Sequence, residues 1–498
     1  MTARCARLRP RPGHACLLVS LLGAVLVPAA APDPAQSASR LFIRGAGFGH
    51  GVGMSQWGAY GFARRGREYR AILRHYYTGT ALGPAPAGRT VRVLLRSGGS
   101  SSFTGARRAA GRRLDPSATY TATRRSATRV ALRSASGRLL LSTTAPLRVL
   151  PGGRPLTLLG PAANGRSGGS YRGALEFRPS GSGLIAVNAV SLEAYVRGVV
   201  PVESPPSWPA EALKAQAVAA RSYAITTGGG AAGYDQFADT RSQVYGGVAV
   251  EEGSTDAAVS ATRGEVVTYQ GTPVTTFFFS TSGGRTENVE NSFSGSAPKP
   301  WLKSVRDPYD GSSPKHRWGP LRLTLGQARG KLGSLVKGSF RGVDVVRRGR
   351  SPRVIAADVI GSRGRTRVTG ATLRARFGLF DTWAFFTVIR TGAKPPPLPD
   401  GDAPVGDEPA GGGDPTGGAA PARAALRRSA APRAVLSGAV RPARRGTTAA
   451  VQLRRGARWD TVASVRLGPR GRYELPVSVP GRYRVRHGAL RGPSVRVR

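Results

Sequence analysis

The clearest pattern of hydrophobic and polar positions in the chain predicts a helix over residues 209–226. Its apolar side chains recur at the i, i+4, i+7 and i+11 spacing of one helical face. They are Leu213, Ala217, Ala220 and Ala224. Pro209 suits the first helical position, and three glycines from Gly228 end the pattern. Because the apolar face is almost all alanine, we expect a neighbouring element to pack closely against it.

Short apolar runs on both sides of this helix predict buried strands. Those upstream are residues 183–188 and 195–200, and those downstream are 265–269, 273–279 and 353–359. Nearer the N-terminus, residues 41–82 combine a glycine-rich opening with two helix-like stretches. The mixture predicts an α+β fold, with a strand-rich core over residues 90–390 and one strong helix within it.

The two ends of the chain differ in composition from this core. Residues 1–38 have the pattern of a secretory signal: four arginines, then an apolar run over residues 15–27, then small residues 29–31. We expect cleavage near residues 30–38. Residues 391–432 are rich in Pro, Gly and Ala and predict a linker. Short strands with polar turns predict a small all-β sandwich over 433–498. The domain between leader and linker is then 39–390, in a secreted or wall-associated protein.

Charge narrows the range of partners. The 498 residues carry 74 Lys plus Arg against 27 Asp plus Glu, a net charge of +47, and all but seven of the cations are Arg. Genome composition and selection for a polyanionic partner both remain as explanations. An exported chain without a zinc-finger or RNA-binding pattern favours anionic cell-wall polymers over nucleic acid. Both cysteines, Cys5 and Cys16, lie in the leader, so we expect no disulfide and no thiolate metal site in the mature chain.

Several common catalytic classes are excluded by their missing motifs. Residues 45–58 contain many glycines but lack both the G-x-G-x-x-G phase and the Lys-Ser/Thr pair of a phosphate-binding loop. The single G-x-S-x-G match, at residues 165–169, lies in a polar loop without the strand-turn-helix context of a nucleophile elbow. There is no H-E-x-x-H motif and no His/Cys cluster for catalytic zinc.

A carboxylate is the remaining catalytic candidate. Glu203 follows an apolar run and is flanked by Pro201, Val202, Pro205 and Trp208. Desolvation there is expected to raise its pKa, as a general acid requires, and to outweigh the dipole of the helix that starts at residue 209. The alternative is a loop carboxylate that pairs with one of the many arginines.

The glycine-rich segment also has two interpretations. Its backbone can approach a ligand closely, with His50, Ser55, Gln56 and Trp57 set into it. Alternatively, it is a glycine-rich turn that holds a structural histidine.

Residues 195–205 (YVRGVVPVESP) and 211–224 (EALKAQAVAARSYA) resemble the signature of the SpoIID/LytB family of sporulation and wall-remodelling proteins. Residues 49–59 (GHGVGMSQWGA) resemble the second signature of that family. Shorter matches are 239–245 (DTRSQVY), 282–287 (SGGRTE) and the stretch 370–380. The resemblance covers roughly residues 41–390.

The family resemblance implies particular site residues. The catalytic acid of the family maps onto Glu203. Substrate positioning or support of that acid is implied for eight other residues: Lys214, Gln216, Arg221, Tyr223, His50, Ser55, Gln56 and Ser282. Some members bind zinc after the catalytic helix through His and Cys, but here that region has Ser242 and no cysteine. We therefore expect no metal and no cofactor, and a salt bridge between Asp239 and Arg241.

The resemblance implies a peptidoglycan lytic transglycosylase, a wall enzyme that cuts the MurNAc–GlcNAc bond of glycan strands and leaves an anhydro product. The alternative is a non-catalytic wall-binding protein that enhances an amidase, which would then be a partner. In the sporulation protein the GHGVGMSQ signature follows the catalytic Glu, whereas here it precedes Glu203 by about 150 residues. A circular permutation of the domain would explain that order.

Overall fold

The structure is a computed structural model that describes residues 39–228, 233–389 and most of the strands between 434 and 497. The predicted leader (1–38) and linker (391–432) lie outside the described residues. Within the described parts of the chain, no helix is long and apolar enough to cross a membrane.

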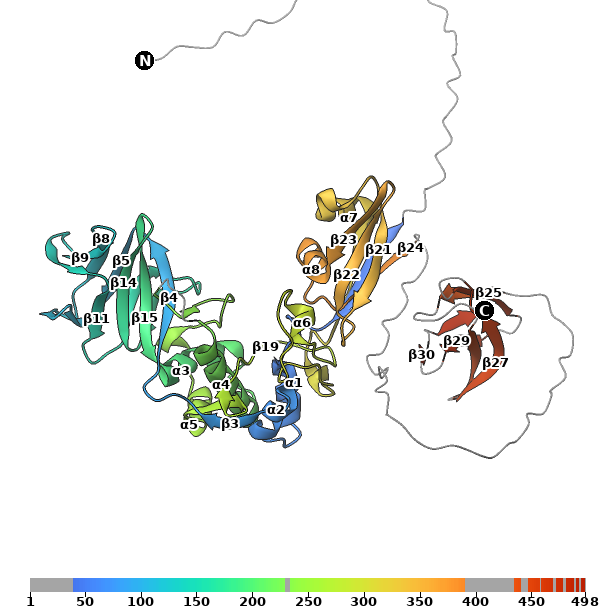
Figure 1. Cartoon of the computed structure of the whole chain (residues 1–498), viewed down its shortest axis with the longest axis horizontal. Coiled ribbons are helices and arrows are strands. Elements are labelled where there is room, and N and C mark those ends of the chain that lie inside the picture. Colours follow the sequence, from blue (N-terminus) through green and yellow to red (C-terminus); the bar gives the residue numbers. More distant parts are fainter. Residues whose placement is uncertain are drawn as a thin grey trace, which may run out of the picture.

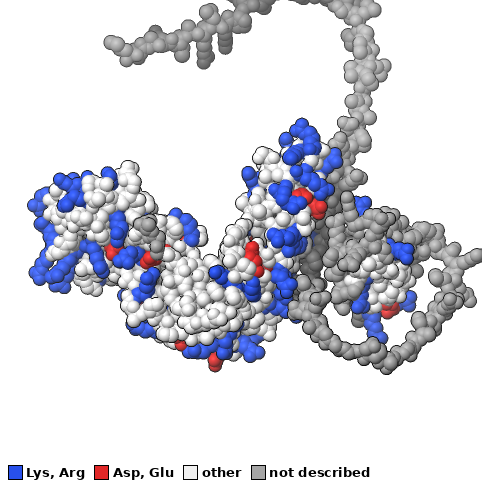
Figure 2. Space-filling model, in the orientation of Figure 1, with Lys and Arg blue, Asp and Glu red and all other residues white. Residues whose placement is uncertain are grey.

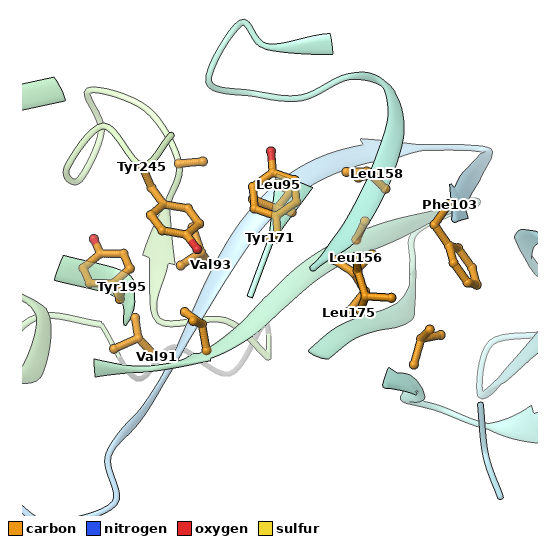
Figure 3. Packing of buried hydrophobic residues seen from close by; sticks show 14 of the residues in the cluster. Val91, Val93, Leu95, Phe103, Leu156, Leu158, Tyr171, Leu175, Tyr195 and Tyr245 are labelled. Atoms are coloured by element: carbon orange, nitrogen blue, oxygen red, sulfur yellow. The ribbon is translucent and has the colours of Figure 1, made fainter. Parts of the chain in front are cut away.

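Two sheets and the helices α3 (Leu192–Glu203), α4 (Ala210–Thr226) and α5 (Gly253–Ala261) share the largest core. One sheet has the order β16-β4-β15-β14-β11-β6-β7, and the other has the order β10-β9-β8-β5-β12-β13. The first contains β16 (Gln236–Phe237), β4 (Thr90–Gly98), β15 (Gly183–Ser191), β14 (Ala174–Ser180), β11 (Leu147–Pro151), β6 (Ala106–Ala109) and β7 (Arg112–Arg113). The second contains β10 (Leu139–Thr144), β9 (Arg129–Ser134), β8 (Tyr120–Arg124), β5 (Ser100–Thr104), β12 (Leu156–Pro161) and β13 (Ser167–Tyr171). Figure 3 shows side chains of this core, with Val93 and Leu95 of β4 in the same cluster as Leu156 and Leu158 of β12.

Helix α4 (Ala210–Thr226) confirms the predicted helix, with Pro209 at its N-cap. The predicted alanine face joins the sheet core through Leu213, Ala217, Ala220 and Ala224. The opposite face, including Ala215 and Val218, lies in a second core with α1 (Gln56–Ala63) and α2 (Tyr69–Tyr76). Helix α4 therefore lies between the two cores. Because its side chains on both faces are small, both cores pack closely against it, and α4 fixes their relative position.

Two of the predicted strands are wrong or largely wrong. Residues 195–200 are helical, within α3 (Leu192–Glu203). The buried positions Leu192, Tyr195, Val196, Val199 and Val200 follow the i, i+3, i+4, i+7, i+8 spacing of a helix, which overrides the strand preference of valine. Of residues 273–279, only the ends pair, in β18 (Thr272–Pro273) and β19 (Phe278–Phe279). The strands predicted at 183–188, 265–269 and 353–359 are confirmed as β15, β17 (Glu265–Tyr269) and β22 (Val354–Gly361).

The glycine-rich segment crosses the second core as β2 (Met54–Ser55), which pairs in parallel with β19. Gly53 shows why the segment needs glycine. It has a φ of 76°, and a Cβ there would lie 2.0 Å from the carbonyl oxygen of Phe277. The same core also includes residues of β17, which pairs with β3 (Ala81–Pro84), and Val289 of α6 (Val289–Ser292). Helix α5 (Gly253–Ala261) packs against α4.

A third unit brings the two ends of the 39–389 region together. Strand β1 (Arg40–Ala46) lies between β20 (Arg317–Thr324) and β24 (Ala384–Ile389), and Arg40 is opposite Ile389. The adjoining elements are β21 (Phe340–Arg348), β22, β23 (Gly364–Thr369), α7 (Leu325–Leu332) and α8 (Gly370–Phe377). Figure 1 shows this unit and the two-sheet unit at opposite ends, with α1 and α4 between them. Adjacent chain ends are what a circular permutation requires.

The described residues of the C-terminal region contain seven strands. They are β25 (Ala434–Ala439), β26 (Thr448–Arg455), β27 (Arg458–Arg466), β28 (Arg472–Val477), β29 (Gly481–His487), β30 (Leu490–Arg491) and β31 (Val495–Val497). Five of them, β26 to β29 and β31, confirm predicted strands. Strands β25 and β28 form one sheet, and the others form a second around a small core. That the two sheets pack as a sandwich stays a prediction.

Candidate functional site

Glu203 is the last residue of α3 and its side chain is half-buried. Its Oε1 accepts a hydrogen bond from the backbone N–H of Val244 at 3.0 Å, and its Oε2 accepts one from Gln56 Nε2 at 3.3 Å. Burial raises the pKa of the Glu203 carboxyl, and the two hydrogen bonds offset part of that rise. The carboxyl end of α3 also disfavours a negative charge there.

Glu203 has no cationic neighbour in ion-pair range among the residues that the structure describes. The alternative of an arginine-paired loop carboxylate is therefore not what the structure shows. An unpaired, partly desolvated carboxyl holds its proton to a higher pH than an exposed carboxyl does, which suits a general acid.

Gln56 joins the two separate sequence motifs at this carboxyl. It begins α1, and its Nε2 donates to the backbone oxygen of Glu203 at 2.9 Å as well as to the side chain. The same nitrogen lies 3.4 Å from Oε1 of Gln216 on α4, which also accepts from Ser204 Oγ at 3.4 Å. Gln216 is buried, and its Nε2 has no hydrogen-bond partner among the described residues. Gln56 and Gln216 thus form a polar support behind Glu203.

Tyr223 lies on the side of α4 that faces Glu203. Its pKa is raised mainly by burial, and the negative charge of Glu203 adds to the rise. Hydrogen bonding with Thr227 and Ser242 opposes this rise. Tyr223 is half-buried, so its hydroxyl is a neutral polar group close to the acid.

Three half-buried aromatic side chains from segments next to Gln56 and Glu203 in the sequence form a cluster. Ring centroids of Trp57 and Trp208 are 5.1 Å apart, and Tyr60 lies 5.1 Å from Trp208 and 5.4 Å from Trp57. Trp57 follows Gln56 in α1, and Trp208 lies in the loop between Glu203 and α4. We call these three residues the aromatic wall, a surface on which the C–H face of a sugar ring can pack.

Lys214 and Arg221 are not brought to Glu203. Lys214 Nζ pairs with Glu211 Oε1 at 2.7 Å on the outer side of α4. Arg221 is fully buried, and its guanidinium donates two hydrogen bonds of 2.9 Å to the carboxylate of Glu193. It also donates to the backbone oxygen of Glu265 at 3.0 Å. Arg221 therefore joins α3, α4 and β17 and presents no surface to a substrate.

His50 has a structural environment. Its Nδ1 accepts from the N–H of Val52 at 3.1 Å, which leaves Nε2–H to donate to the Phe278 oxygen at 3.0 Å. The ring packs between Phe279 and Phe293, and burial lowers the pKa of His50 to about 4. This neutral histidine agrees with the interpretation of the segment as a glycine-rich turn around a structural side chain.

Ser55 and Ser282 are also engaged in internal contacts. Ser55 Oγ caps α1 by accepting from Gly58 N at 3.1 Å and accepts from Ser282 N at 3.2 Å. Ser282 Oγ donates to Asp310 Oδ2 at 3.0 Å, and both serines are buried. They hold the glycine-rich turn in place and lie behind the candidate site.

The segment that follows α4 contains the predicted salt bridge, with Asp239 Oδ2 and Arg241 Nη2 2.7 Å apart. Ser242 Oγ accepts from Phe237 N at 3.1 Å. In the described parts of the chain, no three His, Cys, Asp or Glu side chains are grouped to hold a metal ion. The expectation that the protein needs no metal stays a prediction.

The sequence analysis missed one contributor, the backbone N–H of Val244. It lies in the 239–245 match, so the motif pointed to the segment but not to the atom. A cavity of about 920 Å³ at the C-terminal end of α4, with Thr226, Tyr269 and Trp301 in its lining, does not include Glu203. We place the candidate site at the carboxyl, because the cavity has no acid in its lining.

Comparisons with known proteins agree with the motifs in this geometry. The family described as Stage II sporulation protein matches residues 180–269, which include α3 and α4. Stage II sporulation protein D of Bacillus subtilis is 32% identical over 212 residues, 39% of this chain and 60% of that protein. An amidase enhancer of the same organism is 41% identical over 116 residues, 23% of this chain and 15% of the enhancer. An uncharacterised protein of Brachyspira hyodysenteriae is 42% identical over 135 residues, 26% of this chain and 37% of that protein.

The matched region contains the helix pair α3–α4 and the acid at the junction of the two helices. Over this region the chain matches the SpoIID family, and its similarity to a Stage II sporulation protein D and to an amidase enhancer agrees with that match. The chain spans between about a seventh and three fifths of the length of these relatives.

Proposed function

We propose that this protein is a cell-wall enzyme that cleaves peptidoglycan glycan strands by lytic transglycosylation. The single observation that carries the proposal is the Glu203 carboxyl, which is partly desolvated, free of an ion pair and fixed by Val244 and Gln56. The aromatic wall, whose residues adjoin Gln56 and Glu203 in the sequence, suits a sugar polymer. The names of two relatives, a sporulation protein and an amidase enhancer, agree with a role at the wall.

One acid suffices for this chemistry. Glu203 in its protonated form donates its proton to the glycosidic oxygen, and the bond from that oxygen to C1 of the muramoyl residue breaks. The resulting carboxylate accepts the proton of the C6 hydroxyl as its oxygen attacks C1. No water is consumed, and the product is a 1,6-anhydro end. A hydrolytic glycosidase needs a second carboxylate across the bond, whereas here the nucleophile belongs to the substrate and is already close.

The test is Glu203→Gln, with Glu211→Gln as the matched control on the outer side of α4. Gln keeps the shape of the side chain but has no acidic proton, so we expect cleavage to fall at least ~10²-fold. The control should keep its rate, because the polar partners of Glu211 are Lys214 and the backbone N–H of Tyr69, neither of which binds Glu203. Mass spectrometry of peptide-free glycan strands detects the anhydromuramoyl ends, and circular dichroism checks the fold.

Two results would contradict the proposal. Full activity in a folded Glu203→Gln protein would remove this acid from the reaction. Intact strands after incubation with the unmodified protein would favour the other family role, a wall-binding protein that enhances an amidase.

A further inference from the structure

The part of the two-sheet unit between residues 100 and 161 has an unusual charge. It carries 11 arginines, no lysine and a single acidic residue, Asp115, whereas the whole chain has 74 cationic and 27 acidic residues. We call this part the arginine lobe. Ten of its arginines are exposed, and only Arg133 is half-buried. Genome composition raises arginine everywhere, but it does not explain the local loss of acids.

The charges of the arginine lobe are not neutralised by the protein. No ion pair joins any of its arginines to a carboxylate of the described residues. Several of these arginines donate hydrogen bonds to neutral oxygens, as Arg112 does to the Leu140 oxygen and Arg129 to the Ser142 oxygen. Asp115 is engaged by Ser117, through both its N–H and its hydroxyl. Figure 2 shows Lys and Arg gathered over the lobe around β8, β9 and β11.

A hollow of about 450 Å³ lies in the arginine lobe. Arg112, Arg113 and Arg138 line it, together with Ser134 and Ser136, whose hydroxyl oxygens are 2.9 Å apart. Asp115 is also in the lining, so three cations face one carboxylate there. Guanidinium forks and hydroxyl donors around one hollow suit a phosphate, which offers several acceptor oxygens in a compact group.

We propose that the arginine lobe is a binding site for a linear phosphodiester polymer without bases, of the polyol-phosphate kind, and that the hollow holds one of its phosphates. The many exposed arginines outside the hollow extend the positive surface, as a polymer requires and a single anion does not. The only aromatic residues of the lobe, Phe103 and Tyr120, are buried, so no ring is available to stack on the bases of a single-stranded nucleic acid.

This site is separate from Glu203, and the proposal does not depend on the proposed function. The arginines of the hollow come from β7 and the loop between β9 and β10, whereas Glu203 ends α3. Binding at the lobe would hold the protein on a polymer and leave cleavage of soluble glycan strands unchanged.

The experiment compares two triple variants of the full chain in binding to poly(glycerol phosphate) across a salt series. The first, R112Q/R113Q/R138Q, removes the cations of the hollow. The second, R322Q/R341Q/R347Q, removes three exposed arginines of the third unit and the same total charge. For three lost phosphate contacts at ~0.7 each, the slope of log K against log salt should fall by about 2 in the first variant only. Its affinity at low salt should fall at least ~10-fold.

Several outcomes would overturn the proposal. Equal losses in both variants would show a general effect of net charge, and no loss in the first would show that the hollow is unused. Equal binding of polyglutamate would argue against phosphate, and tighter binding of oligothymidylate would indicate a nucleic-acid partner. R112K/R113K/R138K keeps the charge and loses the guanidinium fork, so we expect it to retain the salt slope and bind more weakly. That variant keeps the test decisive if the Gln variant folds poorly, and thermal melting identifies such a failure.

Discussion

Replacement of Arg221 by Met tests whether this family position is structural. Met is apolar and similar in length, so it fills much of the space but leaves Glu193 without its partner. It also leaves the backbone oxygens of Glu265 and Val259 without the guanidinium donor. Removal of one partner of a buried ion pair typically costs ~3–5 kcal/mol. For a cooperative unit of about 350 residues, whose entropy of unfolding is roughly 0.7 kcal/mol/K, that cost lowers Tm by about 4–7 °C.

Calorimetry of three variants would measure this effect. Lys214→Met is the control, because its pair with Glu211 is partly exposed and is worth under ~1 kcal/mol. The double variant Arg221→Met/Glu193→Leu replaces both charges by apolar groups and should recover part of the lost Tm. The recovery is incomplete because the two backbone oxygens still lack their donor.

The result that would refute this reasoning is specific. A Tm within 1 °C of the unmodified protein, together with a large loss of binding to glycan strands, would show that Arg221 acts on the substrate. The substrate-positioning role implied by the family resemblance would then be correct.

Three further predictions follow from the same structure. Burial beside Asp310 raises the pKa of Asp307 to about 7, so the folded state holds a proton that the unfolded state loses near pH 4. The stability of the protein should therefore fall as the pH rises from about 4 to 7. Asp307→Asn should flatten the profile of Tm against pH over that range. Trp208→Ala should weaken strand binding and raise KM several-fold while kcat changes less, as steady-state kinetics would show, because we expect the aromatic wall to bind sugar units away from the reacting bond. Truncation after residue 390 should leave activity on soluble strands unchanged but weaken retention on whole walls, most visibly at low salt. Equal retention of the full chain and the truncated chain in a sedimentation assay would dismiss a tethering role for the C-terminal strands.

The sequence by itself determined the features that depend on local spacing. The helix now called α4, the strands β15, β17 and β22 and the C-terminal strands follow from periodicity and from turn residues. Glu203 emerged from its apolar flanks and from the family motif. The salt bridge between Asp239 and Arg241 was also predictable, because the two residues are close in the chain.

Only the tertiary structure decided which motif residues meet at Glu203. Gln56 and Gln216 reach its surroundings, whereas Lys214 pairs on the outside of α4 and Arg221 is buried against Glu193. Sequence spacing tells which face of a helix a residue occupies, but not what packs on that face, and α4 has a core on each side. Strand propensity likewise failed for α3, because burial of one helical face outweighs the preference of valine for strands. For the residues around Glu203, contacts between distant segments decide which side chains meet, and no local pattern encodes those contacts.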